Sequence, residues 1–213
     1  MKSQAVIDQI IEELKVLYPG AECSLDFNPE KAYELLFSVR LAAQCTDARV
    51  NLVTPVLYSK FPTLEALAAA TEEEVGEIIH STGFWRAKAR DIVAASKMLL
   101  SEYDGWVPDT MEDLLKLPGV GRKTANLILG DVFGQPSYVC DTHCIRITGR
   151  LGITDGSKDP VQVERQLRLA IPAEESGDFC HRMVLFGRDT CTARSPKCGD
   201  CPLKADCTTG KKL

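Results

Sequence analysis

The sequence predicts an all-α fold, and two observations support that prediction. Apolar residues recur at three- and four-residue steps in almost every segment, as with Val6, Ile10, Leu14 and Leu17, and this spacing places them on one face of a helix. No segment shows a convincing alternation of apolar and polar residues with the period of two that is typical of strands. The 213 residues are enough for one large domain or two small ones.

Cap and stop signals divide the chain into helices with short connections. Thr46, Thr63 and Thr71 are predicted N-caps, because an acidic residue follows each of them within the first helical turn. A helix is therefore expected to begin after each of these threonines. Further helices are expected at about residues 6–17, 29–44, 84–103, 109–116, 121–133, 141–151, 160–170 and 176–188.

The composition indicates a globular protein that does not enter a membrane. Its hydrophobic content of 45% and charged content of 26% are ordinary values. No apolar run approaches the roughly 18 residues that a membrane span needs. Acidic residues interrupt the apolar pattern of the first helix, which argues against a signal peptide. We therefore expect a cytoplasmic protein.

The distribution of charge predicts an anionic partner that meets one face of the molecule. The net charge of −5 argues against indiscriminate binding to nucleic acid. Residues 115–150 and 191–213 are exceptions, because each segment carries five cationic residues against two acidic ones. An acidic body with two local basic segments suits a partner that is bound through those segments alone.

The segment "LPGVGRKTAN", residues 117–126, is the first candidate site. It is not a nucleotide-binding P-loop, because Arg122 separates Gly121 from Lys123 and a helical pattern precedes it where a strand is required. Gly119 and Gly121 permit positive φ angles and a close approach of the backbone to another molecule, and the amides that begin the second helix can donate to a phosphate. The pattern favours a DNA-binding hairpin, with a plain turn between two helices as the alternative.

Lys123 is a candidate amine nucleophile. A lysine is mostly protonated at neutral pH, but a helix N-terminus, neighbouring cations and partial desolvation favour the neutral amine. Such a nucleophile needs a carboxylate that stabilises positive charge on the substrate. Asp141, in the segment "VCDTHCIR", is the candidate, although taken alone it is more simply the N-cap of the next helix.

Four of the nine cysteines lie close together near the C-terminus. Cys191, Cys198, Cys201 and Cys207 have the spacing Cys-x6-Cys-x2-Cys-x5-Cys. Four thiolates can hold zinc or an iron–sulfur cluster. Structural zinc sites usually use two Cys-x2-Cys pairs, whereas this segment has one, so the spacing favours iron and sulfur.

In their order along the chain, these segments resemble the endonuclease III family of DNA glycosylases. The resemblance covers nearly the whole length and includes "LAAQCTDARVN", the helix-hairpin-helix "LPGVGRKTAN", "DTH", "FGRDTC" and the cysteine loop. It implies a helix-hairpin-helix glycosylase fold of two helical lobes with a DNA groove between them. A six-helix barrel is expected at residues 25–135, with the hairpin at about 109–133. Residues 1–24 and 136–213 would form the second lobe, whose loop 191–207 carries a 4Fe–4S cluster.

The resemblance also implies an activity and a partner. The enzyme would flip an oxidised pyrimidine out of double-stranded DNA, since the sugar carbon C1′ cannot be reached within the stack. Lys123 would displace the base with the help of Asp141, and the resulting Schiff base would undergo β-elimination, which cuts the strand 3′ to the abasic site. Such a protein would associate with the nucleoid, and we expect a monomer.

The same resemblance assigns further DNA contacts by position. Gln44 would fill the space that the flipped base leaves, with Asp47 beside it, and His143 would lie near the DNA-facing pocket. The hairpin residues Gly119, Gly121 and Arg122 and the loop residues Arg194 and Lys197 would contact the DNA backbone. An alkali cation is expected beside a phosphate at the carbonyl groups of Leu115, Leu117 and Val120.

Two features depart from the pattern of the family. Phe84 stands where these enzymes typically carry a leucine wedge, so the preference for the base opposite the lesion is expected to differ. The overall acidity is unlike the basic members, which implies a strong dependence on the two basic segments and a steep salt dependence of binding.

Two rival functions remain to be tested. An adenine-mismatch glycosylase would carry a catalytic glutamate where this chain has Arg40, would lack the lysine at position 123, and would have an additional C-terminal domain. A non-catalytic DNA-binding module could use the hairpin and the cysteine loop for recognition only. Lys123 and Asp141 together favour the enzyme.

Overall fold

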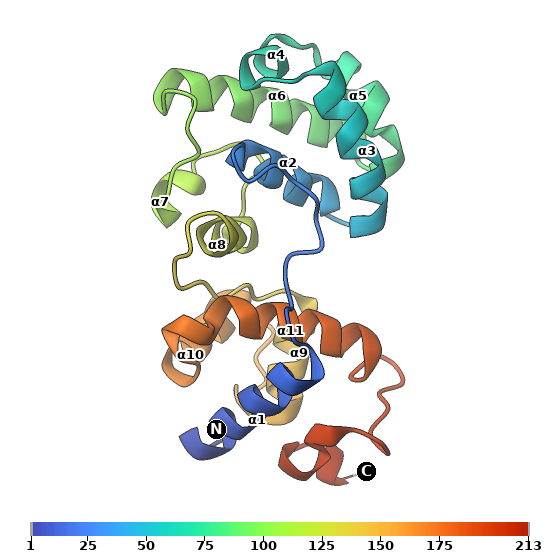
Figure 1. The fold of residues 1–213 in the computed structure, drawn as a ribbon, viewed down its shortest axis with the longest axis vertical. Helices are drawn as coiled ribbons and strands as arrows, with labels where there is room; N and C mark the ends of the chain where they lie inside the picture. The colour runs from blue at the N-terminus through green and yellow to red at the C-terminus, as the bar shows by residue number, and fades with distance from the viewer. Residues whose placement is uncertain (1, 213) are drawn as a thin grey trace. The chain divides into compact units, whose positions relative to one another are not determined.

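The computed structural model describes residues 2–212, which form helices joined by turns and loops (Figure 1). No β-strand occurs in this range, as the sequence predicts. The chain divides into two compact units. We call Cys23–Gly134 the central unit, and Met1–Glu22 together with Gln135–Leu213 the terminal unit. None of the described helices has the length and apolarity that crossing a membrane requires.

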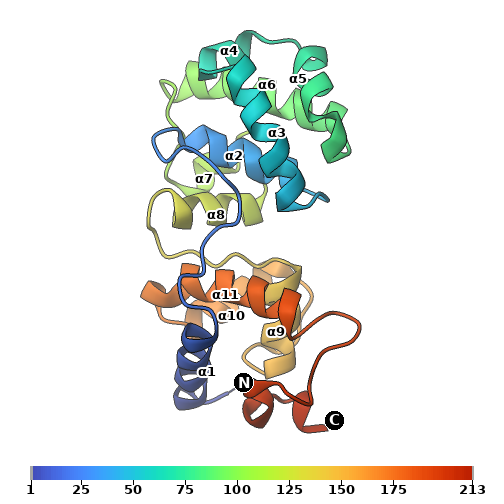
Figure 2. The same ribbon diagram turned by 45° about the vertical axis from the view of Figure 1, so that its right-hand side comes forward.

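The central unit is built around α2, which is buried along most of its length. Its elements are α2 (Ala32–Ala42), α3 (Asp47–Lys60), α4 (Leu64–Ala69), α5 (Glu72–Ile79), η1 (His80–Thr82), α6 (Trp85–Glu102), α7 (Met111–Leu114) and α8 (Arg122–Asp131). Helix α2 packs against α3, α6 and α8, and α6 packs against α4 and α5 (Figure 2). Leu35, Leu36 and Leu41 of α2 are almost fully buried at the centre of this arrangement.

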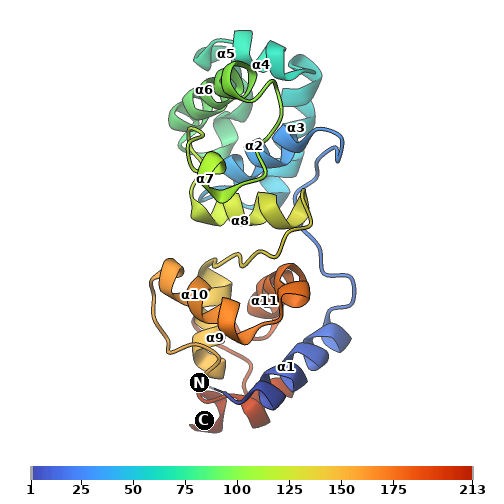
Figure 3. The same cartoon turned by 90° about the vertical axis from the view of Figure 1, so that its left-hand side faces the viewer.

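The terminal unit joins the two ends of the chain. Its elements are α1 (Gln4–Leu17), α9 (Thr142–Leu151), α10 (Pro160–Ala170), η2 (Ala173–Glu175), α11 (Ser176–Asp189), η3 (Pro202–Asp206) and η4 (Gly210–Lys212). Helix α11 packs against α9 and α1, and α1 also contacts η3 (Figure 3). The face of α1 that carries Ile7, Ile10 and Leu14 is buried in these contacts.

Local sequence signals explain where most helices begin. The predicted caps are confirmed: the hydroxyls of Thr46, Thr63 and Thr71 accept backbone N–H groups in the first turns of α3, α4 and α5. Two predicted helices are shorter than expected. Helix α2 ends at Ala42, because the backbone leaves the helical conformation at Ala43 with a ψ of 112°, and Gln44 then adopts a left-handed conformation. Helix α7 ends at Leu114, shortly before Pro118, which disfavours helical backbone in the residue that precedes it.

Candidate functional site

The hairpin between α7 and α8 places the N-terminus of a helix at the surface. Leu117 is buried, and its carbonyl accepts the N–H of Val120 at 3.1 Å, which closes the turn. Helix α8 then begins after Gly121, which has no side chain to cap it. The first turn of α8 therefore lacks a side-chain cap, and helix N-termini of this kind generally suit an anion.

An ion pair from two other helices supports the tip of the hairpin. Arg40 of α2 donates from Nε and Nη2 to the Oδ2 atom of Asp91 on α6, at 2.9 and 2.7 Å. A Cβ atom on Gly119 would lie 2.8 Å from Arg40 Nε and 2.8 Å from Asp91 Oδ2, closer than real Cβ contacts allow. Sequence reasoning missed this partner of Arg40, because Asp91 lies 51 residues away in the chain.

The two glycines of the hairpin have different roles. Gly119 has a φ of +76°, so the predicted positive φ is confirmed there. Gly121 does not use that freedom, because its φ of −105° is accessible to any residue, and its Cβ position is open. Only Gly119 is therefore required by the fold itself, and Gly121 leaves room for a ligand.

Gly119→Ala should destabilise the protein by about 1–3 kcal/mol, because it forces an alanine into left-handed backbone and against the Arg40–Asp91 pair. Gly121→Ala is the matched control and should leave the melting temperature nearly unchanged, since its backbone is extended and its surroundings are open. Thermal unfolding followed by circular dichroism measures both variants. Equal effects at the two positions would contradict this assignment.

Lys123 is the second residue of α8, and its side chain is exposed. The expectation that the protein itself partly desolvates this lysine is therefore wrong. The neighbouring Lys116 differs, because its ammonium donates to Asp113 at 2.8 Å and this hydrogen bond raises the pKa of Lys116. Lys116 is thus held as a cation by a neighbouring carboxylate on its own side of the hairpin.

Asp141 belongs to the terminal unit, so the two proposed catalytic residues come from different units. It is the N-cap of α9, as predicted, and its Oδ1 atom accepts the N–H of Cys144 at 2.7 Å. The cap uses one carboxylate oxygen. His143 follows in the first turn of α9, where its Nδ1 lies 3.2 Å from Nη2 of Arg146. Nη2 of Arg146 also donates to the carbonyl of Cys191 at 3.0 Å, which connects α9 to the cysteine loop.

Gln44 and Phe84 share an unusual backbone conformation in the central unit. Both have positive φ, at 55° and 48°, and both are exposed. Phe84 presents 67% of its surface to solvent. Left-handed backbone in a residue other than glycine costs about 1–3 kcal/mol, and such strain is concentrated at functional sites. Asp47, in the first turn of α3, accepts a hydrogen bond from the hydroxyl of Ser24 at 2.6 Å.

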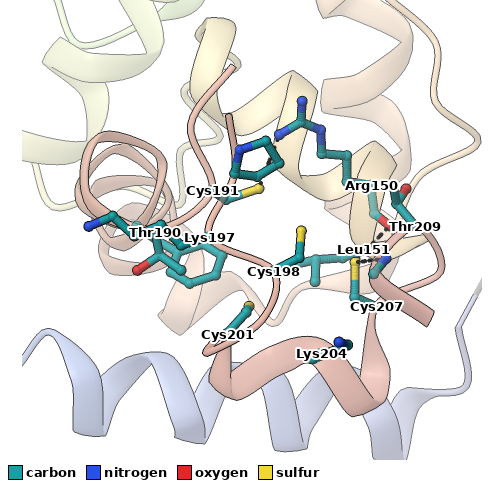
Figure 4. Close-up of a pocket in the computed structure, with 13 residues that line it drawn as sticks. Arg150, Leu151, Thr190, Cys191, Lys197, Cys198, Cys201, Lys204, Cys207 and Thr209 are labelled. Carbon is teal, nitrogen blue, oxygen red and sulfur yellow. Dashed lines mark hydrogen bonds between the residues drawn. The ribbon is translucent and has the colours of Figure 1, made fainter. Parts of the chain in front are cut away.

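The four clustered cysteines surround one cavity of about 190 Å³ in the terminal unit (Figure 4). Two N–H groups point to their sulfur atoms: Arg150 donates to Cys191 Sγ at 3.4 Å and the Gly210 amide to Cys207 Sγ at 3.1 Å. Within residues 2–212, no three potential ligands are placed to hold a single metal ion. Four thiols around a cavity with N–H donors to sulfur match the chemistry of an iron–sulfur cluster, which is larger than one ion.

The cysteine loop is fixed to α9 by an arginine and carries two exposed cations. Arg150 donates to the carbonyls of Thr192 and Ala193, at 2.7 and 2.9 Å. Arg194 and Lys197 follow on the same loop and are exposed. The Nζ atom of Lys197 lies 3.6 Å from an oxygen of Asp189 in a surface ion pair, which contributes little energy and leaves the lysine able to meet another anion.

Comparisons with known proteins agree with this arrangement. Residues 37–173 match the family model of the HhH-GPD superfamily base excision DNA repair protein, and residues 191–207 match the iron-sulfur binding domain of endonuclease III. Endonuclease III of Synechocystis sp. is 46% identical over 95% of this chain and 92% of its own length. Endonuclease III of Bacillus subtilis is 42% identical over 97% and 93%. A solved structure of a trapped endonuclease III–DNA covalent intermediate superposes with a TM-score of 0.93, at 42% identity, over 100% of this chain and 99% of that one.

Proposed function

This chain belongs to the endonuclease III family of helix-hairpin-helix base excision DNA repair proteins, and on that premise we propose that it removes oxidised pyrimidines through Lys123. Membership makes it a bifunctional DNA glycosylase and abasic-site lyase that acts on double-stranded DNA and carries a 4Fe–4S cluster. We further propose the class of its substrate, the residues that perform each step, and a location of the protein in the cytoplasm at the nucleoid.

The exposed amine of Lys123 at the start of α8 is the observation that carries the proposal. Nζ would attack C1′ of a flipped nucleotide, and the glycosidic bond would break with its electron pair passing to the departing base. Loss of a proton from nitrogen and opening of the sugar then give a Schiff base. Removal of a C2′ proton from this species expels the 3′ phosphate by β-elimination. The lysine is released by hydrolysis.

Asp141 would assist the first of these steps. Its carboxylate would stabilise the positive charge that develops on the sugar as the base departs. The N-cap hydrogen bond to Cys144 holds the side chain in one orientation and uses only Oδ1. Because Lys123 and Asp141 come from different units, bound DNA would be contacted by both.

We also propose the lobe assignment of the family for the two parts of the chain. Residues 25–135 would be the six-helix barrel with the hairpin, and residues 1–24 with 136–213 the iron–sulfur lobe. The separation of Cys23–Gly134 from the rest of the chain supports this assignment.

The surface residues of the central unit would hold the distorted duplex. Phe84 would enter the base stack as a wedge, and Gln44 would occupy the space of the flipped base. Asp47 is close to Gln44 in sequence. The strained backbone at Gln44 and Phe84 supports these two roles. The amides after Gly119 and Gly121, with Arg122, would bind a phosphate. The carbonyls of Leu115, Leu117 and Val120 would hold an alkali cation beside it.

In the terminal unit, Cys191, Cys198, Cys201 and Cys207 would ligate the cluster. When bound, the cluster joins four points of one loop and supplies structural rigidity. The loop would then present Arg194 and Lys197 to phosphates of the duplex. His143 lies at the start of α9, close to Asp141 in sequence.

Replacing Cys198 with serine should remove the cluster, because a hydroxyl is a poor ligand for this soft site. The natural protein should be yellow-brown with iron bound, and the variant should lose both the visible absorption and the iron. Cys180, which is buried in α11 and does not line the cysteine cavity, provides the control, and Cys180→Ser should keep its colour. A colourless natural protein that contains stoichiometric zinc would contradict the cluster assignment.

Borohydride trapping on a duplex with one thymine glycol tests the function directly. A Schiff base reduced by borohydride becomes a permanent covalent adduct, so the natural chain should be trapped and should release a strand cut 3′ to the lesion. Binding without trapping on any damaged duplex would favour the non-catalytic module. Release of adenine opposite 8-oxoguanine, with none of thymine glycol, would favour the mismatch enzyme, although Arg40 occupies the position of its catalytic glutamate and pairs with Asp91.

A further inference from the structure

A buried lysine of the central unit has no place in the chemistry described so far. Lys88, in the second turn of α6, is fully buried. Its ammonium donates to the backbone carbonyls of Leu41 and Thr82, at 2.7 and 2.8 Å. Burial lowers the pKa of Lys88, because the charged form loses its hydration. The two carbonyl bonds compensate for part of that loss.

The two carbonyls lie a few residues before Gln44 and Phe84, which are two of the three non-glycine residues with positive φ in the described part of the chain. Leu41 is in the last turn of α2, three residues before Gln44. Thr82 ends η1, two residues before Phe84. Both bonds share one nitrogen atom, so the two carbonyl oxygens can be no farther apart than the two bond lengths together. One ammonium thus links the backbone shortly before Gln44 to the backbone shortly before Phe84.

Lys88 also contacts Phe84 through its own backbone. Its N–H donates to the carbonyl of Phe84 at 3.2 Å and closes the first turn of α6. On the α2 side, the turn is closed by the N–H of Cys45, which donates to the carbonyl of Ala42 at 3.0 Å. Leu41 is one of the last residues of α2, whose carbonyls have no partner within the helix, and Lys88 satisfies it.

We propose that Lys88 is a positioning residue that sets the separation between Gln44 and Phe84, so that both enter the duplex together when a base is flipped. The inference rests on the proposed roles of these two residues. It assigns Lys88 to the opening of the duplex and not to bond cleavage, since no atom of Lys88 is exposed to substrate.

The test is Lys88→Met, which keeps the hydrocarbon length and removes the N–H donors. Lys97→Met is the matched control, because Lys97 lies on the same helix and is exposed. Two activities are compared under single turnover: base release from a thymine glycol duplex, and borohydride trapping on a single-stranded abasic oligonucleotide. Only the first requires a wedge in a duplex. A displacement of about 1 Å can reduce a rate on the order of 100-fold, and we expect a loss of that size on the duplex, with trapping on the single strand nearly unchanged.

Combination with Gln44→Ala and Phe84→Ala shows whether Lys88 acts through these residues. If it does, Lys88→Met adds little to the double variant, because coupled residues are not additive. Lys88→Gln, which keeps a shorter donor, should recover part of the duplex activity. Equal losses on both substrates, full additivity, or failure of both Lys88 variants to fold would overturn the proposal. Absence of trapping in the natural chain would instead overturn the proposed function, so the two failures are distinguishable.

Discussion

Replacing Lys123 with alanine is expected to abolish covalent trapping and to reduce strand cleavage by at least about a thousandfold, because no other group replaces a covalent nucleophile. The variant should remain folded and should still bind the damaged duplex, since the side chain is exposed and contributes nothing to the core. Borohydride trapping and gel analysis of the cut strand measure the chemistry. An electrophoretic mobility shift measures the binding.

Lys116→Ala is the appropriate control for this variant. Lys116 lies on the same hairpin, and its hydrogen bond to Asp113 raises its pKa and keeps it protonated. It should therefore be a poor nucleophile, and its removal should leave an adduct of normal yield. Trapping that persists in Lys123→Ala but is lost in Lys116→Ala would identify Lys116 as the nucleophile instead.

Asp141→Asn is expected to reduce base release on the order of 100-fold or more, while the melting temperature changes little. Asparagine is as good an N-cap as aspartate, so its side-chain oxygen can still accept the N–H of Cys144. What the variant loses is the negative charge that would stabilise the cationic sugar. Single-turnover base release and thermal unfolding, measured on the same preparation, separate these effects.

Two further variants show whether the cap or the charge matters. Asp141→Ala should lose the cap as well, at a cost of about 1 kcal/mol in stability. Asp159 caps α10 in the same way, accepting the N–H of Val161 at 3.0 Å. Asp159→Asn should therefore leave base release unaltered. A normal rate of base release in Asp141→Asn would show that Asp141 is only a structural cap.

The hairpin, the cysteine loop and the helix caps could be predicted from the sequence because each is defined by residues close together in the chain. Thr71 and Glu74 form a capping box across three residues, and Gly119 adopts its positive φ within a four-residue turn. The spacing of the four cysteines likewise predicts one loop, and that loop surrounds one cavity. Local hydrogen bonding and backbone sterics decide such features.

Other features of the candidate site depend on partners that are distant in sequence. The exposure of Lys123 is set by how α8 packs, and the sequence alone predicted a partly desolvated side chain there. One signal for Lys88 was present: it lies on the same face of α6 as the buried Ile92 and Leu99. A periodic pattern places a residue on the buried face but does not identify which group it meets there.

The tertiary structure therefore decided which residues hold the candidate site in place. The sequence was sufficient to predict the family of the protein, its helical fold class and its candidate chemistry. Arg40 meets Asp91 across 51 residues, and Lys88 meets Leu41 across 47. These contacts exist because α2 and α6 pack together and bury polar groups that must then be satisfied. A buried charge takes whichever partner the packing brings within hydrogen-bond distance, and only the folded chain defines that partner.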